Sequence, residues 1–205
     1  MSIGTVLFLA LAILCLFSVG ERTCAGLGWP CLFAAAILAG AALLQAQPVL
    51  IGLGGGTISP VGAGFLLSCG IWAAYRSLIR GERALRLVLS VLLCGLWMLL
   101  LLMLWNRQGV WESLLPGAAC GLLAALVADS RTGTLACALL GTLVANVLFF
   151  VYSIVTGGIG MLEVGTGYGW NLAAVSLWCA IWLYEFRDAL RRFVFLRSPG
   201  KRKAS

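Results

Sequence analysis

The sequence predicts an all-α fold, a polytopic bundle of about seven transmembrane helices, and three observations lead to it. Of the 205 residues, 62% are hydrophobic and only 10% are charged, whereas a soluble domain is roughly 45–50% apolar and about 25% charged. Apolar runs close to the roughly 20 residues that a spanning helix needs follow one another with short polar breaks. The basic residues gather in alternate breaks, as they do in multi-pass membrane proteins.

Seven apolar runs follow in order along the chain. The first ends at a charged break over 20–26, and the second begins with Pro30, which suits a first helical turn. Small residues four apart in the fifth and sixth runs predict faces that another helix can approach closely; they are Gly117, Gly121 and Ala125, then Ala138, Thr142 and Asn146. The expected helices are 3–19, 29–45, 60–75, 85–105, 112–128, 134–153 and 170–186.

The distribution of basic residues predicts the orientation, because loops rich in Lys and Arg stay in the cytoplasm. With seven crossings and the C-terminus inside, only Arg107 of the 14 basic residues falls outside, and the N-terminus is outside. The predicted location is therefore the cell (plasma or inner) membrane, with several crossings. The inner set is Arg22, Arg76, Arg80, Arg83, Arg86, Arg131, Arg187, Arg191, Arg192, Arg197, Lys201, Arg202 and Lys203.

The predicted domain organisation is a helical transmembrane domain over 1–186 and a basic cytoplasmic tail over 187–205. In the tail, apolar residues at helical spacing alternate with arginines, which is typical of a helix on a membrane surface. Docking of a soluble partner is the alternative. Seven arginines are candidates for contact with anionic lipid headgroups: Arg76, Arg80, Arg83, Arg86, Arg187, Arg191 and Arg192.

The glycine-rich stretch over 52–64 admits three interpretations. A phosphate cradle would need a Gly-Lys-Ser/Thr ending, which the stretch lacks. A broken or re-entrant segment could line a path for an ion or small solute. An outer loop followed by a closely packed helix is the structural alternative. The residues concerned are Gly54, Gly55, Gly56, Thr57, Ser59 and Pro60.

Two further polar residues are candidates for a path or for packing. Asn146 lies inside an apolar run, where an amide can hydrogen-bond across helices or contact a solute. Glu163 lies in an outer link without Lys or Arg, so it either attracts a cation or is a solvated loop residue.

The residue inventory argues against most catalytic chemistry. The chain has no histidine, which removes His-dependent hydrolysis, haem ligation and most zinc sites. Its eight cysteines are scattered through apolar runs without a Cys-x-x-Cys pair and are expected to be small buried hydrophobic residues. We expect no cofactor, no metal, no nucleic-acid partner and no enzymatic activity.

Three segments resemble the YphA-like family of small multi-pass bacterial membrane proteins. They read GGTISP at 55–60, ADSRTG at 128–133 and LEVGTGYGWN at 162–171. The resemblance implies a bacterial cell membrane and supplies no activity.

Two functions are compatible with these patterns. The first is a non-enzymatic membrane protein that acts through helix packing, as a homo-oligomer or with a membrane partner. The alternative is a transporter or channel subunit for a small solute or ion that uses the 52–64 stretch.

Overall fold

The computed structural model describes residues 2–17, 21–45, 50–53, 56–104, 113–156, 163–165 and 167–196. Within these ranges the chain forms eight helices and three very short strands, so the predicted all-helical fold is confirmed. The helices are α1 Ile3–Leu16, α2 Glu21–Leu27, α3 Cys31–Leu44, α4 Pro60–Ile79, α5 Ala84–Leu104, α6 Leu114–Val127, α7 Arg131–Val155 and α8 Gly167–Leu196. The strands are β1 Ile51–Leu53, β2 Gly56–Ile58 and β3 Glu163–Val164.

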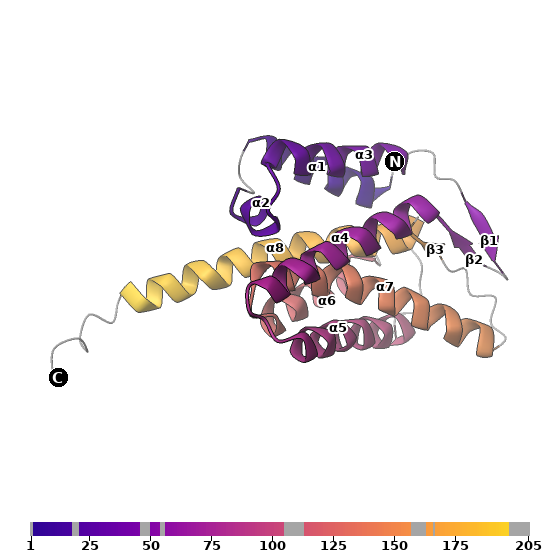
Figure 1. The fold of residues 1–205 in the computed structure, drawn as a ribbon. Coiled ribbons are helices and arrows are strands. Elements are labelled where there is room, and N and C mark those ends of the chain that lie inside the picture. Colours follow the sequence, from indigo (N-terminus) through magenta and orange to yellow (C-terminus); the bar gives the residue numbers. More distant parts are fainter. Residues whose placement is uncertain are drawn as a thin grey trace.

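α7 is the central helix, packed against α4, α5, α6 and α8 (Figure 1). Every residue over 132–139 is buried. Small residues make this possible, because they let neighbouring backbones approach closely. A Cβ added at Gly141 would lie 2.9 Å from the Cβ of Cys94 in α5, and one added at Gly70 of α4 would lie 2.6 Å from Leu140.

The small-residue face predicted in the fifth run packs against α8. A Cβ added at Gly121 would lie 2.5 Å from the carbonyl oxygen of Ser176, and one added at Gly117 would lie 2.9 Å from Val175. Ala125 of the same face is buried. This face of α6 therefore packs against another helix of the same chain.

α1 and α3 lie side by side and form a separate layer, with α1 resting on α8 (Figure 1). The backbone N–H of Gly4 donates to Asn171 Oδ1 at 2.7 Å, which satisfies one of the free N–H groups at the start of α1. The indole N–H of Trp178 donates to the Leu7 carbonyl at 2.8 Å. Two side chains of α8 therefore fix α1 in place.

The first apolar helix ends before the charged segment over 20–26, as expected, but this segment contains a short helix, α2, that the sequence did not predict. Gly28, with φ of 74°, ends this short helix in the left-handed region that favours glycine. The N–H of Trp29 donates to the Cys24 carbonyl at 2.9 Å, and that of Gly28 donates to Ala25 at 3.2 Å. This pattern is a Schellman-type helix end, which satisfies carbonyls that a break would leave free.

Among the described residues, three helices are long and apolar enough to cross a membrane: α4, α5 and the 131–152 part of α7. α3 and α6 have 14 residues each, which gives a length of roughly 21 Å at about 1.5 Å per residue. A hydrocarbon core is about 30 Å thick, so neither helix spans it alone. By length and composition the structure shows fewer spans than the seven crossings expected.

α8 is the longest helix, with 30 residues, and it projects beyond the bundle (Figure 1). It continues without interruption through the boundary at residue 186 that the sequence suggested between domain and tail. Residues 197–205 of that tail lie outside the described residues.

Candidate functional site

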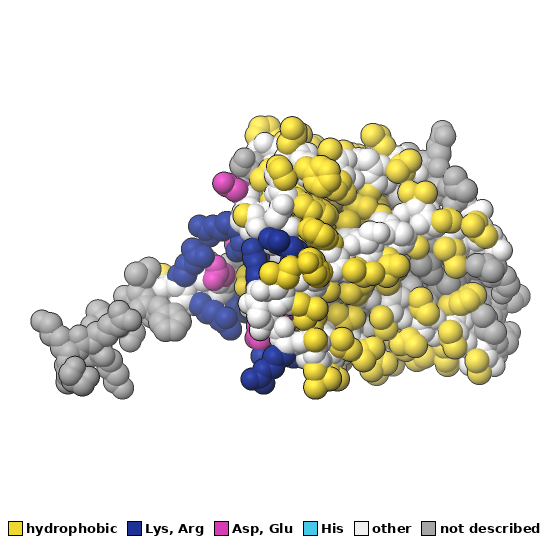
Figure 2. Space-filling view, viewed as in Figure 1, with side chains coloured by type: hydrophobic (Ala, Val, Ile, Leu, Met, Phe, Trp, Pro, Cys, Tyr) yellow, Lys and Arg dark blue, Asp and Glu magenta, His cyan; other side chains and the backbone are white. Residues whose placement is uncertain are grey.

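Charged side chains gather at one end of the bundle, whereas most of the visible surface beyond it is apolar (Figure 2). We call this region the charged end. It comprises α2, the end of α4 and the start of α5 with the turn between them, the turn between α6 and α7 with the start of α7, and the part of α8 from residue 185. Its charged residues are Glu21, Arg22, Arg76, Arg80, Glu82, Arg83, Arg86, Asp129, Arg131, Glu185, Arg187, Asp188, Arg191 and Arg192.

Glu82 joins the two turns of the charged end. Its Oε1 accepts from the backbone N–H of Asp129 at 3.2 Å and its Oε2 accepts from the Ser130 hydroxyl at 2.8 Å. Ser130 also caps the start of α7 by accepting from Gly133 N–H at 2.8 Å. A Cβ at Gly133 would lie 2.4 Å from Glu82 Oε2, so a side chain there would displace the carboxylate. Sequence reasoning missed Glu82, although it is the only acid in the 76–86 segment.

Two ion pairs cross the charged end. Arg86 pairs with Asp129, but both side chains are 54% exposed, and such surface pairs contribute at most about 1 kcal/mol. Arg131 pairs with Glu185 at 2.8 Å and is more shielded, since its side chain is only 15% exposed. The guanidinium of Arg131 also lies over the ring of Tyr184, 5.4 Å from its centroid.

Arg187 caps the C-terminal end of α6. Both its terminal nitrogens donate to the Ala128 carbonyl at 3.1 Å, and one also donates to the Ala125 carbonyl. A cation at this position opposes the negative end of the helix dipole. The sequence predicts that Arg187 contacts lipid headgroups. In the structure its side chain also donates hydrogen bonds to the backbone.

Side chains of α4 hold the end of α2. Trp72 Nε1 donates to the Leu27 carbonyl at 3.0 Å, and Arg80 Nη2 donates to Ala25 at 3.3 Å. Arg76 lies between them, where a Cβ at Gly28 would be 2.9 Å from its Nη2. Trp72 and Arg76 are four apart on one face of α4, and Arg80, the residue that caps the end of α4, continues this spacing.

The other arginines predicted to contact lipid differ in their surroundings. Arg192 pairs with Asp188 one turn earlier, at 2.6 Å. Arg83 and Arg191 are exposed.

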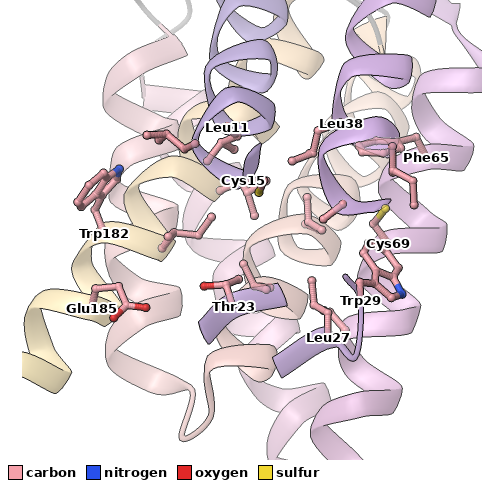
Figure 3. A pocket seen from close by; sticks show the side chains of 18 residues that line it. Leu11, Cys15, Thr23, Leu27, Trp29, Leu38, Phe65, Cys69, Trp182 and Glu185 are labelled. Carbon is pink, nitrogen blue, oxygen red and sulfur yellow. The ribbon is translucent and has the colours of Figure 1, made fainter. Parts of the chain in front are cut away.

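A cavity of about 130 Å³ opens between the α1–α3 layer and helices α4, α7 and α8 (Figure 3). Its walls are mostly apolar, with Leu38 and Phe65 toward one end. Thr23 and Glu185 lie at the other end, together with part of α2. The cavity therefore has a long apolar part and a polar part next to the charged end. Sequence reasoning missed it, because its lining comes from helices far apart in the chain.

The glycine-rich stretch forms part of a small sheet at the opposite end of the bundle (Figure 1). β1 pairs antiparallel with β2, and β2 pairs parallel with β3, with Thr57 opposite Glu163. Two of the predicted path residues therefore lie at neighbouring positions. Gly56 belongs to β2, while Gly54 and Gly55 lie outside the described residues.

Ser59 and Pro60 start α4. The Ser59 hydroxyl accepts from Gly62 N–H at 3.2 Å, and Pro60 occupies the first turn. A Cβ at Gly62 would lie 1.9 Å from the Gly165 carbonyl oxygen. The Gln45 side chain donates to the same carbonyl. Gln45, Gly62 and Gly165 thus join three segments, an arrangement in keeping with the packing interpretation of this stretch.

Asn146 is buried, and its amide nitrogen donates to the carbonyl of Thr142 one turn earlier in α7, at 2.9 Å. Thr142 in turn donates to Leu139 at 2.7 Å. These bonds remain within one helix, so they supply neither the cross-helix bond nor the solute contact considered above.

Five of the eight cysteines pack in two groups. Cys15 and Cys24 face each other with their Sγ atoms 4.0 Å apart. Cys94, Cys120 and Cys137, from α5, α6 and α7, are all buried. Among the described residues, no group of three or more His, Cys, Asp or Glu side chains is placed to hold a metal ion.

Comparison with known proteins finds no relative of this chain. No family model matches the chain, and no curated protein or solved structure matches it.

Proposed function

We propose that the chain is a multi-pass membrane protein whose charged end faces the cytoplasm and whose function is binding rather than catalysis. The observation that carries the proposal is the gathering of charge at one end of the bundle (Figure 2). Arginines distant in sequence, such as Arg22, Arg83 and Arg191, belong to that one end. Cytoplasmic loops of membrane proteins carry such an excess of basic residues.

The proposed arrangement has α4, α5 and α7 as full crossings, with the shorter helices α1, α3 and α6 and the long helix α8 packed beside them as further crossings. Helices too short for the hydrocarbon core can be accommodated by local thinning of the bilayer. An exposed belt of large apolar side chains on α5 supports lipid contact, including Leu89, Leu93 and Leu96. The proposed location is the cytoplasmic membrane of a bacterium, which the YphA-like resemblance would also imply.

The binding partner that the charges favour is the anionic headgroup layer of the cytoplasmic leaflet, worth about 1 kcal/mol for each basic residue near the surface. A homo-oligomer or a membrane-protein partner remains part of the proposal, through the exposed leucines of α5. The Gly117 and Gly121 face is less suited to that role, because α8 already covers it.

Transport through the 52–64 stretch remains the alternative. The cavity does not favour it, since none of the described residues over 51–60 belongs to its lining and its walls are mostly apolar.

The proposal is tested by reporter fusions that distinguish the two sides of the membrane. Fusions after Arg83 and after Arg197 are expected to report cytoplasm, and a fusion after Gly160 is expected to report the outside. A cytoplasmic result after Gly160 would overturn the seven-crossing arrangement. An outside result after Arg83 would overturn the orientation itself.

A further inference from the structure

We propose that Cys15 and Cys24 form a redox site, at which hydrogen peroxide converts the two thiols into a disulfide. Cys15 lies near the end of α1, and Cys24 lies in α2. This covalent modification goes beyond the proposed function, which is binding. Its chemistry does not depend on which side of the membrane the charged end faces.

The two sulfur atoms are already in contact. The Cys24 thiol donates to the Cys15 sulfur, with the Sγ atoms 4.0 Å apart. The S–S bond of a disulfide is about 2.0 Å long, so the sulfurs need to approach each other by only roughly 2 Å. Both residues are buried, Cys15 at 9% exposed and Cys24 at 3%. An oxidised sulfur on one of them therefore meets the other thiol before it meets a thiol from solution.

The cavity gives an oxidant access to one of the two thiols. Cys15 belongs to its lining, which has Thr23 and Glu185 at the polar end (Figure 3). A cavity needs roughly 10–15 Å³ to hold a water molecule, so a volume of about 130 Å³ accommodates hydrogen peroxide. The hydroxyl and the carboxylate at the polar end can hydrogen-bond to such a small polar molecule. Of the two thiols, only Cys15 lines the cavity, so Cys15 reacts first.

Access distinguishes this pair from the second group of cysteines. We call Cys94, Cys120 and Cys137 the core group, since all three are buried between α5, α6 and α7. In the part of the chain that the structure describes, none of the three lines the cavity. A peroxide molecule in the cavity therefore reaches Cys15 and not the core group, which serves as an internal reference.

Two further cysteines lie nearby and define the alternatives. Cys31 packs against the cluster that contains Cys15 and Cys24, which makes it the competing partner of Cys24. Cys69 lines the cavity from α4, so peroxide can reach it as well. The contact between the sulfurs of Cys15 and Cys24 favours their pairing, because a disulfide forms by attack of one sulfur on another at close range.

The reaction takes two steps. The Cys15 thiolate attacks one peroxide oxygen, the O–O bond breaks, and the leaving hydroxide takes up the proton that Cys15 released, which gives water and a sulfenic acid on Cys15. The Cys24 sulfur then attacks the Cys15 sulfur, the S–O bond breaks, and the hydroxide leaves with the Cys24 proton as a second water. The two sulfurs lose two electrons in total, and these reduce the peroxide. Two equivalents of a soluble thiol such as glutathione restore the dithiol by exchange.

The disulfide joins the end of α1 covalently to α2. Trp72 and Arg80 of α4 already hold the end of α2 by hydrogen bonds. In the orientation proposed above, α2 lies on the cytoplasmic side, where disulfides are usually transient and catalytic or redox-sensing. The dithiol is therefore the resting form, and the disulfide is a response to peroxide.

The test follows each cysteine of the purified, reduced chain in detergent. Hydrogen peroxide is added, the remaining thiols are blocked under denaturing conditions, and the oxidised thiols are then reduced and labelled for peptide mass spectrometry. Cys15 and Cys24 are expected to oxidise in equal amounts, at least about tenfold faster than the core group. A non-reducing chymotryptic digest is expected to contain a peptide linked through Cys15 and Cys24, and dithiothreitol should remove the link.

Serine variants identify the partner and the order of the steps. Cys24→Ser is expected to leave a sulfenic acid on Cys15, which dimedone traps. Cys15→Ser should give less than about a tenth as much dimedone adduct on Cys24, because Cys24 does not line the cavity. Cys31→Ser is the matched control and should change the rate of Cys15 oxidation less than about twofold.

A pair of tryptophan variants tests the route through the cavity. Ile181→Trp narrows the cavity from α8 and is expected to slow Cys15 oxidation at least about fivefold. Leu190→Trp, at a position 53% exposed on the same helix, should leave the rate unchanged. Size-exclusion chromatography confirms that each variant is folded. If Ile181→Trp does not fold, the serine variants and the core group still decide.

Four results would overturn the inference. They are a disulfide between Cys24 and Cys31 in place of the Cys15–Cys24 link, oxidation of Cys15 no faster than that of the core group, equal dimedone adducts in Cys15→Ser and Cys24→Ser, and equal rates for the two tryptophan variants. None of these measurements depends on the orientation that the reporter fusions determine, so a failure here is distinguishable from a failure of the proposed function.

Discussion

Gly165 is the residue at which backbone conformation and packing constrain the sequence most tightly. Its φ of 72° lies in the left-handed region, and an added Cβ would be 2.2 Å from the backbone nitrogen of Ala63. Gly81 provides a matched position, since its φ is 90° but no atom lies within 4 Å of an added Cβ. The pair separates the cost of the backbone conformation from the cost of the contact.

We expect Gly81→Ala to lower the free energy of unfolding by about 1–2 kcal/mol, the cost of a left-handed alanine. Gly165→Ala should lower it by at least about 1 kcal/mol more, because the β3 segment must also move away from α4. Unfolding in mixed detergent micelles measures both. Equal losses would mean that the close approach of Gly165 to α4 does not exist in the folded protein.

Residue types were easier to predict from sequence than their partners. The positions of Arg76, Arg80 and Arg187 in basic segments suggested lipid headgroups, yet Arg80 and Arg187 donate to backbone carbonyls at helix ends. An arginine that binds a lipid headgroup and an arginine that caps a helix end can have the same neighbours in sequence. What distinguishes them is a helix end that lies 55 or 59 residues away in the chain.

At the scale of the element, α1 depends on its contacts with α8. Asn171→Ala removes the acceptor for Gly4 N–H and is expected to lower the free energy of unfolding by about 1–2 kcal/mol, as for the loss of a helix cap. Asn171→Asp keeps an acceptor oxygen at the positive end of the α1 dipole and should cost less. Thermal unfolding in detergent compares them. A larger loss for Asp than for Ala would contradict the capping role.

The seven apolar runs correspond to seven of the eight helices, because hydrophobic length is a local property of the sequence. α2 was missed since its residues, Glu21–Leu27, are too few and too polar to signal a helix. Its end depends on Trp72 and Arg80, which sequence alone cannot bring close. The cavity and the Glu82 network were missed for the same reason. The predicted close-packing face of Gly117 and Gly121 was found because its spacing of four is local.

At the scale of the whole molecule, the boundary between bundle and tail lies beyond residue 186. A chain that ends at Phe186 loses Arg187 and its bonds to the end of α6, whereas one that ends at Leu190 keeps them. The shorter chain is expected to be less stable by about 1.5–3 kcal/mol, the value of hydrogen bonds to a charged group. Unfolding in detergent compares the two. Equal stability would show that α6 does not need this cap.

The packing of α1 against α8 has a consequence for how the protein is made. Leu7 and Trp178 are 171 residues apart, and ribosomes add about 5–20 residues per second, so α1 waits roughly 10–30 s for its partner. During that time it can rest on α3, on Phe65 of α4, which contacts Phe8, and on the surrounding lipid. Assembly of the first helix is therefore one of the last events of biogenesis, and a chaperone or insertase that shields α1 and α3 would act in this interval.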